Sequence, residues 1–100
     1  MPHHFRISVQ SLDAGEPVGT PLAFDVANHD DILEIVDKVR LRAPVPADEV
    51  APFAVGLKLF TEVLIRHRAD PLFEPLWPHV GAFMKRLKAL PQGNGEDKGQ

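Results

Sequence analysis

A change from strand-like to helix-like residue spacing within residues 28–36 constrains this fold more than any other feature. Apolar residues alternate with polar ones before this point, whereas after it they recur at helical spacing. Asn28 is a favourable N-cap residue, and Asp30 and Asp31 would then fall in the first helical turn, where negative charge is stabilising. The sequence therefore predicts a strand, a capped turn and an amphipathic helix in immediate succession.

Two alternating segments, Phe5–Gln10 and Leu22–Val26, are predicted to be strands. Between them, residues 13–19 contain two glycines and a proline, residues that are typical of turns. We therefore expect an antiparallel hairpin from Phe5 to Val26. One of its faces would carry the apolar residues Phe5, Ile7, Val9, Leu22, Phe24 and Val26. A lone hairpin is marginally stable in water, so it should pack on helices or on another chain.

Three helices are predicted after the hairpin. The first ends by Ala43, because Pro44 disfavours helical geometry in the residue before it. The second spans roughly 48–68 and is apolar on most of its sides, while Lys58 and Glu62 are expected to point away from the main apolar stripe. The third begins near Pro78. The predicted core comprises Phe24, Ile35, Phe53, Leu57, Phe60, Leu64, Phe83 and Leu87.

This order of elements, ββααα, predicts one α+β domain over residues 4–90. Residues 91–100 contain no apolar side chain that could anchor them, apart from the proline that opens the segment, so a disordered C-terminal tail is predicted. One hundred residues is a common size for a single domain with one core.

Composition narrows the class of protein. The net charge of −3 argues against nucleic-acid binding, which usually requires a basic domain. No apolar run approaches the roughly 18–20 residues that span a bilayer, and the start of the chain lacks the pattern of a signal peptide. Because the chain has no cysteine, it has no disulfide framework and no thiol nucleophile. We therefore expect a cytoplasmic protein without a membrane segment.

The chain resembles a family of small bacterial proteins that is catalogued only as a domain of unknown function. The resemblance lies in Phe24–Arg40, Ala54–Phe60, Pro71–Phe73 and Phe83–Lys88 and covers nearly the whole chain apart from its last ten residues. It implies one compact domain and assigns no activity, cofactor or residue role. Prolines at 52 and 75 depart from the helix formers expected at those positions.

The polar turn formed by Asn28, His29, Asp30 and Asp31 is a candidate ligand site. Two carboxylates beside a histidine could bind a divalent metal ion or transfer protons. Adjacent aspartates on a helix point in different directions, however, and a helix start needs partners for its free N–H groups. We therefore favour capping by Asn28, with His29 as a surface or packing residue, and predict neither a metal nor a cofactor.

Three further residues are candidates for ligand or protein contact. His67 follows Phe60 and Leu64 on one face of the second predicted helix, so it should be partly buried. It could be a pH-sensitive group or ligand contact, or a core residue that forms a hydrogen bond. Phe73 and Trp77 lie in a proline-punctuated apolar linker, which could form a protein-binding surface or fill the monomer core.

One enzymatic interpretation remains open. If Met1 is removed, Pro2 becomes an N-terminal secondary amine directly before a strand, a start that resembles the tautomerase superfamily, whose N-terminal proline acts as a general base. Tautomerases repeat a β-α-β unit, which this chain does not show.

The favoured hypothesis is a non-catalytic interaction or regulatory module. A two-stranded hairpin leaves unpaired edges, and a helix that is apolar on most sides needs more than one neighbour. We therefore expect a weak homodimer or another protein partner, with the edge strand or the Leu72–Trp77 surface at the contact, and no catalytic residue.

Overall fold

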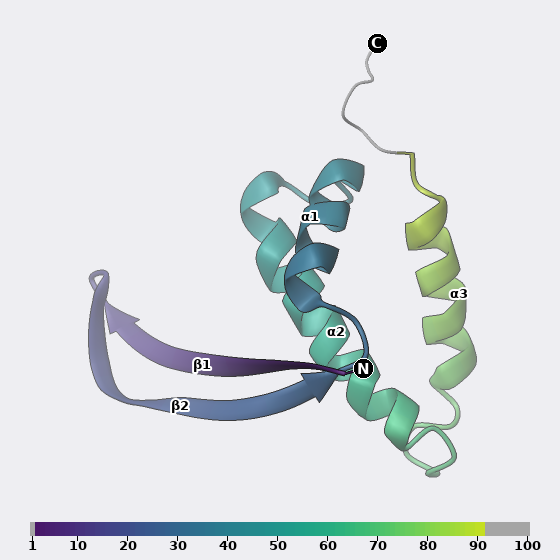
Figure 1. Ribbon diagram of the computed structural model, residues 1–100, viewed down its shortest axis with the longest axis horizontal. Coiled ribbons are helices and arrows are strands. Elements are labelled where there is room, and N and C mark those ends of the chain that lie inside the picture. The colour runs from purple at the N-terminus through teal and green to yellow at the C-terminus, as the bar shows by residue number, and fades with distance from the viewer. Residues whose placement is uncertain (1, 92–100) are drawn as a thin grey trace.

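The computed structural model describes residues 2–91 as a hairpin followed by helices (Figure 1). Its elements are β1 (His3–Asp13), β2 (Glu16–Asn28), α1 (Ile32–Arg42), the short 3-10 helix η1 (Ala47–Glu49), α2 (Val50–Arg66) and α3 (Trp77–Ala89). The predicted α+β order, an antiparallel hairpin followed by three α-helices, is confirmed. The disorder predicted for the C-terminal tail concerns residues that, apart from Pro91, lie outside the described part of the chain.

The hairpin is antiparallel and carries its alternating apolar residues on one face, as predicted. Phe5 lies opposite Val26, and Val9 lies opposite Leu22, so the expected apolar side chains share one face. The strands are joined at Ala14 and Gly15, whose φ angles of 51° and 84° are those of a two-residue hairpin turn. The pairing register shifts once, between Val9 and Ser11.

Helix α1 begins later than predicted. Its N-cap is Asp31, whose side chain accepts a hydrogen bond from the N–H of Leu33 at 3.1 Å. The prediction that Asn28 is the cap is therefore wrong, because β2 continues through Asn28 and its buried side chain has other partners. The predicted end of the helix is confirmed: Ala43 is the C-cap, in a left-handed conformation, directly before the proline.

The core lies mainly between α1 and α2. Its central cluster consists of Val36 and Val39 from α1, and Val50 and Ala54 from the start of α2. Of the predicted core residues, Leu64 and Leu87 are buried. Partial burial is found for Ile35, Phe53 and Leu57.

Three predicted core residues, Phe24, Phe60 and Phe83, are 39–45% exposed, so that part of the prediction is wrong. Phe24 lies on the hairpin face, whereas Phe60 lies to one side of the α2 face that is buried against α1. Phe83 lines an open cavity of about 520 Å³ beside Phe53 and Leu87, so α3 is only partly seated against α2.

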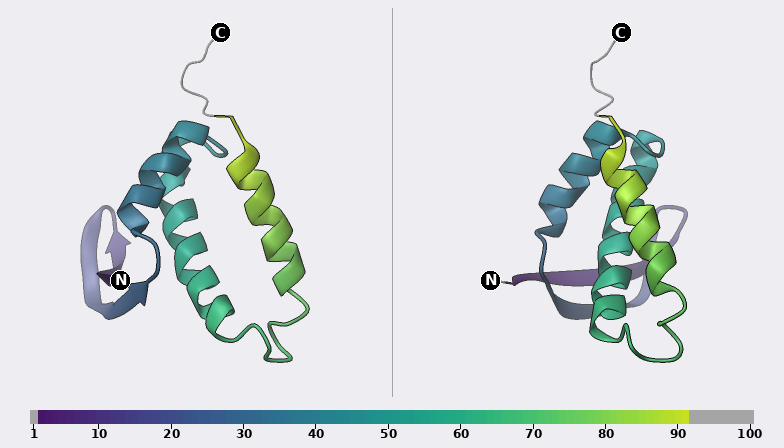
Figure 2. Two further views of the ribbon diagram at one scale, coloured as in Figure 1. Left: turned by 45° about the vertical axis from the view of Figure 1, so that its right-hand side comes forward. Right: turned by 90° about the vertical axis from the view of Figure 1, so that its right-hand side faces the viewer.

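The hairpin projects away from the helices (Figures 1 and 2). α1 and α2 pack side by side, and α3 stands on the other side of the molecule from the hairpin. Within residues 2–91, no helix is both long enough and apolar enough to cross a membrane.

Candidate functional site

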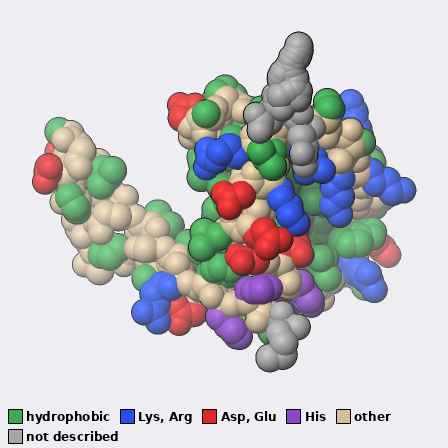
Figure 3. Space-filling model, turned by 45° about the horizontal axis from the view of Figure 1, so that its top comes forward, with side chains coloured by type: hydrophobic (Ala, Val, Ile, Leu, Met, Phe, Trp, Pro, Cys, Tyr) green, Lys and Arg blue, Asp and Glu red, His purple; other side chains and the backbone are tan. Residues whose placement is uncertain are grey.

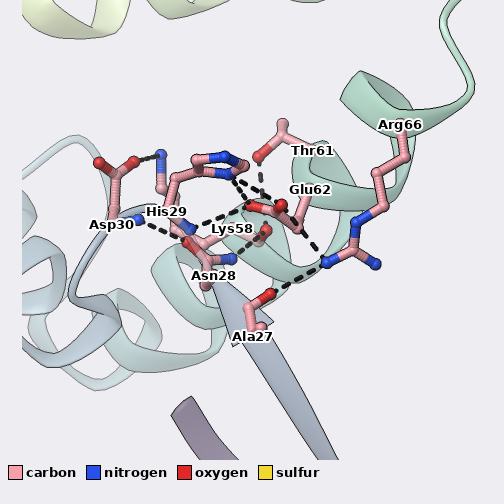
Figure 4. Close-up of polar contacts among 8 residues, drawn as sticks. All are labelled: Ala27, Asn28, His29, Asp30, Lys58, Thr61, Glu62 and Arg66. Carbon is pink, nitrogen blue, oxygen red and sulfur yellow. Dashed lines mark hydrogen bonds and ion pairs between the residues drawn. The ribbon is translucent and has the colours of Figure 1, made fainter. Parts of the chain in front are cut away.

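The end of β2 meets one face of α2 in a polar cluster (Figure 4). We call this the junction cluster and define it as Asn28, His29, Asp30, Lys58, Glu62 and Arg66. The three α2 residues are spaced four apart, which places them along one face of the helix. The first three residues follow one another where the hairpin gives way to α1, so the cluster joins the hairpin to the helices.

Glu62 is the centre of the junction cluster. It is 7% exposed, and its Oε1 accepts a hydrogen bond from the backbone N–H of His29 at 3.2 Å. Its Oε2 lies 2.9 Å from the His29 ring Nδ1 and 3.4 Å from Nη2 of Arg66. Burial acts to raise the pKa of Glu62, but the hydrogen bonds from His29 outweigh it and hold that pKa below its ordinary value. The site therefore favours the ionised carboxylate.

Asn28 ties the strand to α2. It is 3% exposed; its Nδ2 donates to the carbonyl of Lys58 at 3.1 Å, and its Oδ1 accepts from the N–H of Asp30 at 3.0 Å. Arg66 adds a second tie, because its Nη2 donates to the carbonyl of Ala27 at 3.1 Å. The two hydrogen bonds of Asn28 give both the donor and the acceptor of its buried amide a partner, as a buried polar group requires.

An ion pair closes the other end of the cluster. Nζ of Lys58 lies 2.6 Å from Oδ2 of Asp30, and the Lys58 side chain is only 13% exposed. This hydrogen bond from Lys58 lowers the pKa of Asp30. Asp30 therefore neutralises a nearly buried ammonium group.

The geometry allows only limited chemistry. Glu62 orients the His29 ring through Nδ1, as a carboxylate orients a general base, and the His29 side chain is 77% exposed. His29 lines none of the described cavities, and no serine or threonine hydroxyl is hydrogen-bonded to its ring in residues 2–91. Among the same residues, no three His, Asp or Glu side chains converge as metal ligands do. The contacts of the junction cluster join residues 27–29, at the end of the hairpin, to α2.

Sequence reasoning missed the α2 half of this cluster. Lys58 and Glu62 were predicted to point away from the packed face, yet both are largely buried. Their partners lie about 30 residues away in sequence, and amphipathic spacing alone does not reveal such partners. One feature of the sequence could have indicated this half of the cluster. Three charged residues, Lys58, Glu62 and Arg66, are spaced four apart on a helix that is otherwise largely apolar.

The other candidate residues lie elsewhere. His67 is exposed at the C-cap of α2, so the prediction that it is partly buried is wrong. Its ring centroid lies 6.2 Å from that of Phe73, and the guanidinium of Arg68 lies 5.8 Å from the ring centroid of Trp77. Phe73, in the turn between α2 and α3, and Trp77, the first residue of α3, are half-buried. None of these side chains belongs to the junction cluster.

The family model named DUF3861, a domain of unknown function with a solved structure, matches residues 3–89. The chain therefore belongs to this family. A crystal structure of a protein of unknown function from Pectobacterium atrosepticum, at 2.20 Å resolution, has the same fold with a TM-score of 0.75. It is 31% identical in sequence, and the match covers 88% of this chain and 98% of that one. No curated protein matches the chain. The tautomerase alternative, which requires a repeated β-α-β unit, gains no support from these comparisons or from the ββααα order.

Proposed function

We propose that this chain, as a member of the DUF3861 family, is a non-catalytic interaction module that forms a weak homodimer through its hairpin arm, residues 3–28. The observation that supports this is the apolar face of the arm. Val9 is 58% exposed, Leu22 is 64% exposed and Phe24 is 39% exposed. Figure 3 shows hydrophobic side chains along the arm and at its tip, away from the helices.

The two faces of the arm differ in chemistry. One carries the apolar pairs Ile7–Phe24 and Val9–Leu22, whereas the other carries Arg6 and Asp25, whose side chains form an exposed ion pair at 2.7 Å. A row of apolar side chains on one face of a sheet normally packs against a second layer. Within residues 2–91 that layer is missing over the outer part of the arm, which leaves room for one from another molecule.

A second copy of the chain is a suitable partner. Two identical apolar faces are self-complementary about a two-fold axis, and sheets pack face to face at a spacing of about 10 Å. At about 3.4 Å per residue, the 11 residues of β1 span roughly 37 Å, so a two-stranded face offers roughly 400 Å². Stable interfaces bury about 800 Å² per partner. The expected homodimer is therefore weak.

The alternative contact at Leu72–Trp77 is less well supported. Leu72 is 76% exposed and Leu76 is 37% exposed, but Phe73 and Trp77 are half-buried. The two leucines provide less exposed apolar area than Val9, Leu22 and Phe24 on the arm. A cytoplasmic location is part of the proposal.

The test is sedimentation equilibrium from low micromolar to millimolar concentration. We expect a reversible monomer–dimer equilibrium that Leu22→Thr weakens by about tenfold or more, because a two-fold contact loses this leucine twice. Leu33→Gln is the matched control, since Leu33 is 67% exposed on α1, outside the arm, and its replacement should leave the equilibrium unchanged. A monomer at every concentration would refute the proposal, as would a dimer that Leu72→Gln abolishes and Leu22→Thr leaves intact.

A further inference from the structure

A second cavity lies between the three helices. Its volume is about 390 Å³, within the range of small-molecule sites. We call it the basic cavity. Val39 of α1, Leu57 of α2 and Met84 and Leu87 of α3 supply apolar walls. Four cationic side chains also line it: Lys38, Arg42, Lys58 and Lys88.

Two of these cations have carboxylate partners. Lys58 pairs with Asp30 at 2.6 Å, and Lys38 pairs with Glu34 on α1 at 3.1 Å. Asp30 is the single carboxylate that lines the cavity. The side chains that line the basic cavity therefore carry a net positive charge, although the net charge of the whole chain is −3.

Arg42 and Lys88 differ from the other two cations. Neither forms an ion pair among residues 2–91, and Nε of Arg42 is buried without a hydrogen-bond partner. Both side chains line the cavity, so an anion that enters it can pair with them. Figure 3 shows Lys and Arg side chains gathered on the side of the molecule where α3 lies.

We infer that the basic cavity binds a small amphipathic carboxylate, with its anionic group at Arg42 and Lys88 and its apolar body against Leu57, Met84 and Leu87. A guanidinium matches the planar geometry of a carboxylate, and Lys88 adds charge. The flexible thioether of Met84 adapts to apolar groups of different shapes. This inference is independent of the association through the arm.

Other anions fit less well. No aromatic side chain lines the basic cavity, so it offers no stacking surface for a nucleotide base. Two cations without carboxylate partners suit one negative charge better than a polyphosphate. The larger cavity beside Phe53 and Phe83 contains Arg86 as its single Lys or Arg side chain, so it gives no comparable electrostatic argument.

The experiment is an NMR titration of the full chain with octanoate as the probe, at a dilution where the chain is monomeric. Octanoate should produce saturable amide shifts at Lys38–Arg42, Leu57–Lys58 and Met84–Lys88. Heptyltrimethylammonium, which has the same seven-carbon alkyl chain and the opposite charge, should not produce these shifts. Inorganic phosphate should not produce them either. Arg42→Gln should weaken octanoate binding about tenfold or more, because it removes a charge-assisted hydrogen bond.

Arg40→Gln is the matched control, because Arg40 is exposed on the same helix and does not line the cavity. It should bind octanoate as the wild type does. The inference is overturned if no saturable shifts occur, if the cationic probe binds equally well, or if the Arg42 and Arg40 variants bind alike. A second copy of the chain is the other possible occupant, through its hairpin tip, where Asp13 ends β1. The inference is therefore also overturned if the cavity amides shift only when the chain self-associates and if Asp13→Asn abolishes that shift.

Discussion

The α1–α2 pair and the hairpin arm use the same kinds of apolar side chain with opposite results. In α2, Val50, Ala54 and Leu64 are no more than 1% exposed, whereas Val9 and Leu22 in the arm are 58% and 64% exposed. Both regions have the hydrophobic periodicity that their secondary structure requires. The difference shows that periodicity creates an apolar face, and that burial depends on which other element reaches it.

The arm is held to the helices by polar contacts. Asn28, Glu62 and Arg66 connect the end of β2 and the residue after it to α2 through hydrogen bonds to backbone groups of 3.1–3.2 Å. Few of the apolar side chains of the arm reach the helices. Hydrogen bonds are directional, whereas apolar packing is not. The junction cluster thus sets the orientation of the arm, and the core between α1 and α2 provides stability.

The largest expected contrast is between one leucine from each region. Leu64→Ala should lower the free energy of unfolding by about 2–5 kcal/mol, because Leu64 is 0% exposed and its removal leaves a cavity. Leu22→Ala should change it by less than about 0.5 kcal/mol in dilute protein, as is usual for surface positions. Urea unfolding of the two variants at low micromolar concentration measures both values. Similar losses for the two would show that the arm is packed and would remove the contrast.

Glu62→Gln tests the connection between the two regions. The change retains the shape of the side chain but removes the charge that His29 and Arg66 contact, so we expect a loss of about 1–3 kcal/mol in unfolding free energy. Amide shifts should spread from residues 27–30 into the arm. A variant as stable as the wild type would mean that the junction cluster does not hold the hairpin.

The contribution of Glu62 should depend on pH. Its pKa in the folded protein is below the ordinary value of 4.5, so its stabilising effect is present above that value and is lost as pH falls through the lowered pKa. The difference in unfolding free energy between wild type and Glu62→Gln should shrink accordingly in acid. Glu74→Gln, which removes the charge of an exposed glutamate outside the cluster, is the matched control and should be about as stable as the wild type at neutral pH.

The smallest effect concerns the first turn of α1. Asp31→Ala should lower stability by about 1 kcal/mol through loss of the N-cap. Its amide shifts should be confined to the start of α1. Asn28→Ala should also shift the amides of Lys58 and the end of β2, because Asn28 bonds to the Lys58 carbonyl rather than capping the helix. Identical shift patterns for both variants would contradict the separate roles.

Local structure was predictable from the sequence. The apolar face of the hairpin follows from the alternation in Phe5–Gln10 and Leu22–Val26, and the end of α1 follows from Pro44. The start of α1 was misplaced by three residues, because Asn28 and Asp31 are equally good caps and only the extent of β2 decides between them.

The candidate site was only half predictable. The turn at residues 28–31 was recognised as polar, but its function depends on Lys58 and Glu62, which are distant in sequence. Burial of Phe24 and Phe60 was predicted wrongly because hydrophobicity marks a face and does not show whether another element covers it. For a similar reason the sequence does not reveal that Arg42 lines a cavity, because residues of three helices form that cavity.

The most direct test of the central claim, that the arm is an interface between copies, is an isotope-filtered nuclear Overhauser experiment. A mixture of labelled and unlabelled chains at millimolar concentration reports only contacts between molecules. We expect intermolecular contacts from the methyl groups of Val9 and Leu22, with none from Leu64 in the core. Intermolecular contacts confined to other surfaces, or none at all at that concentration, would contradict the account.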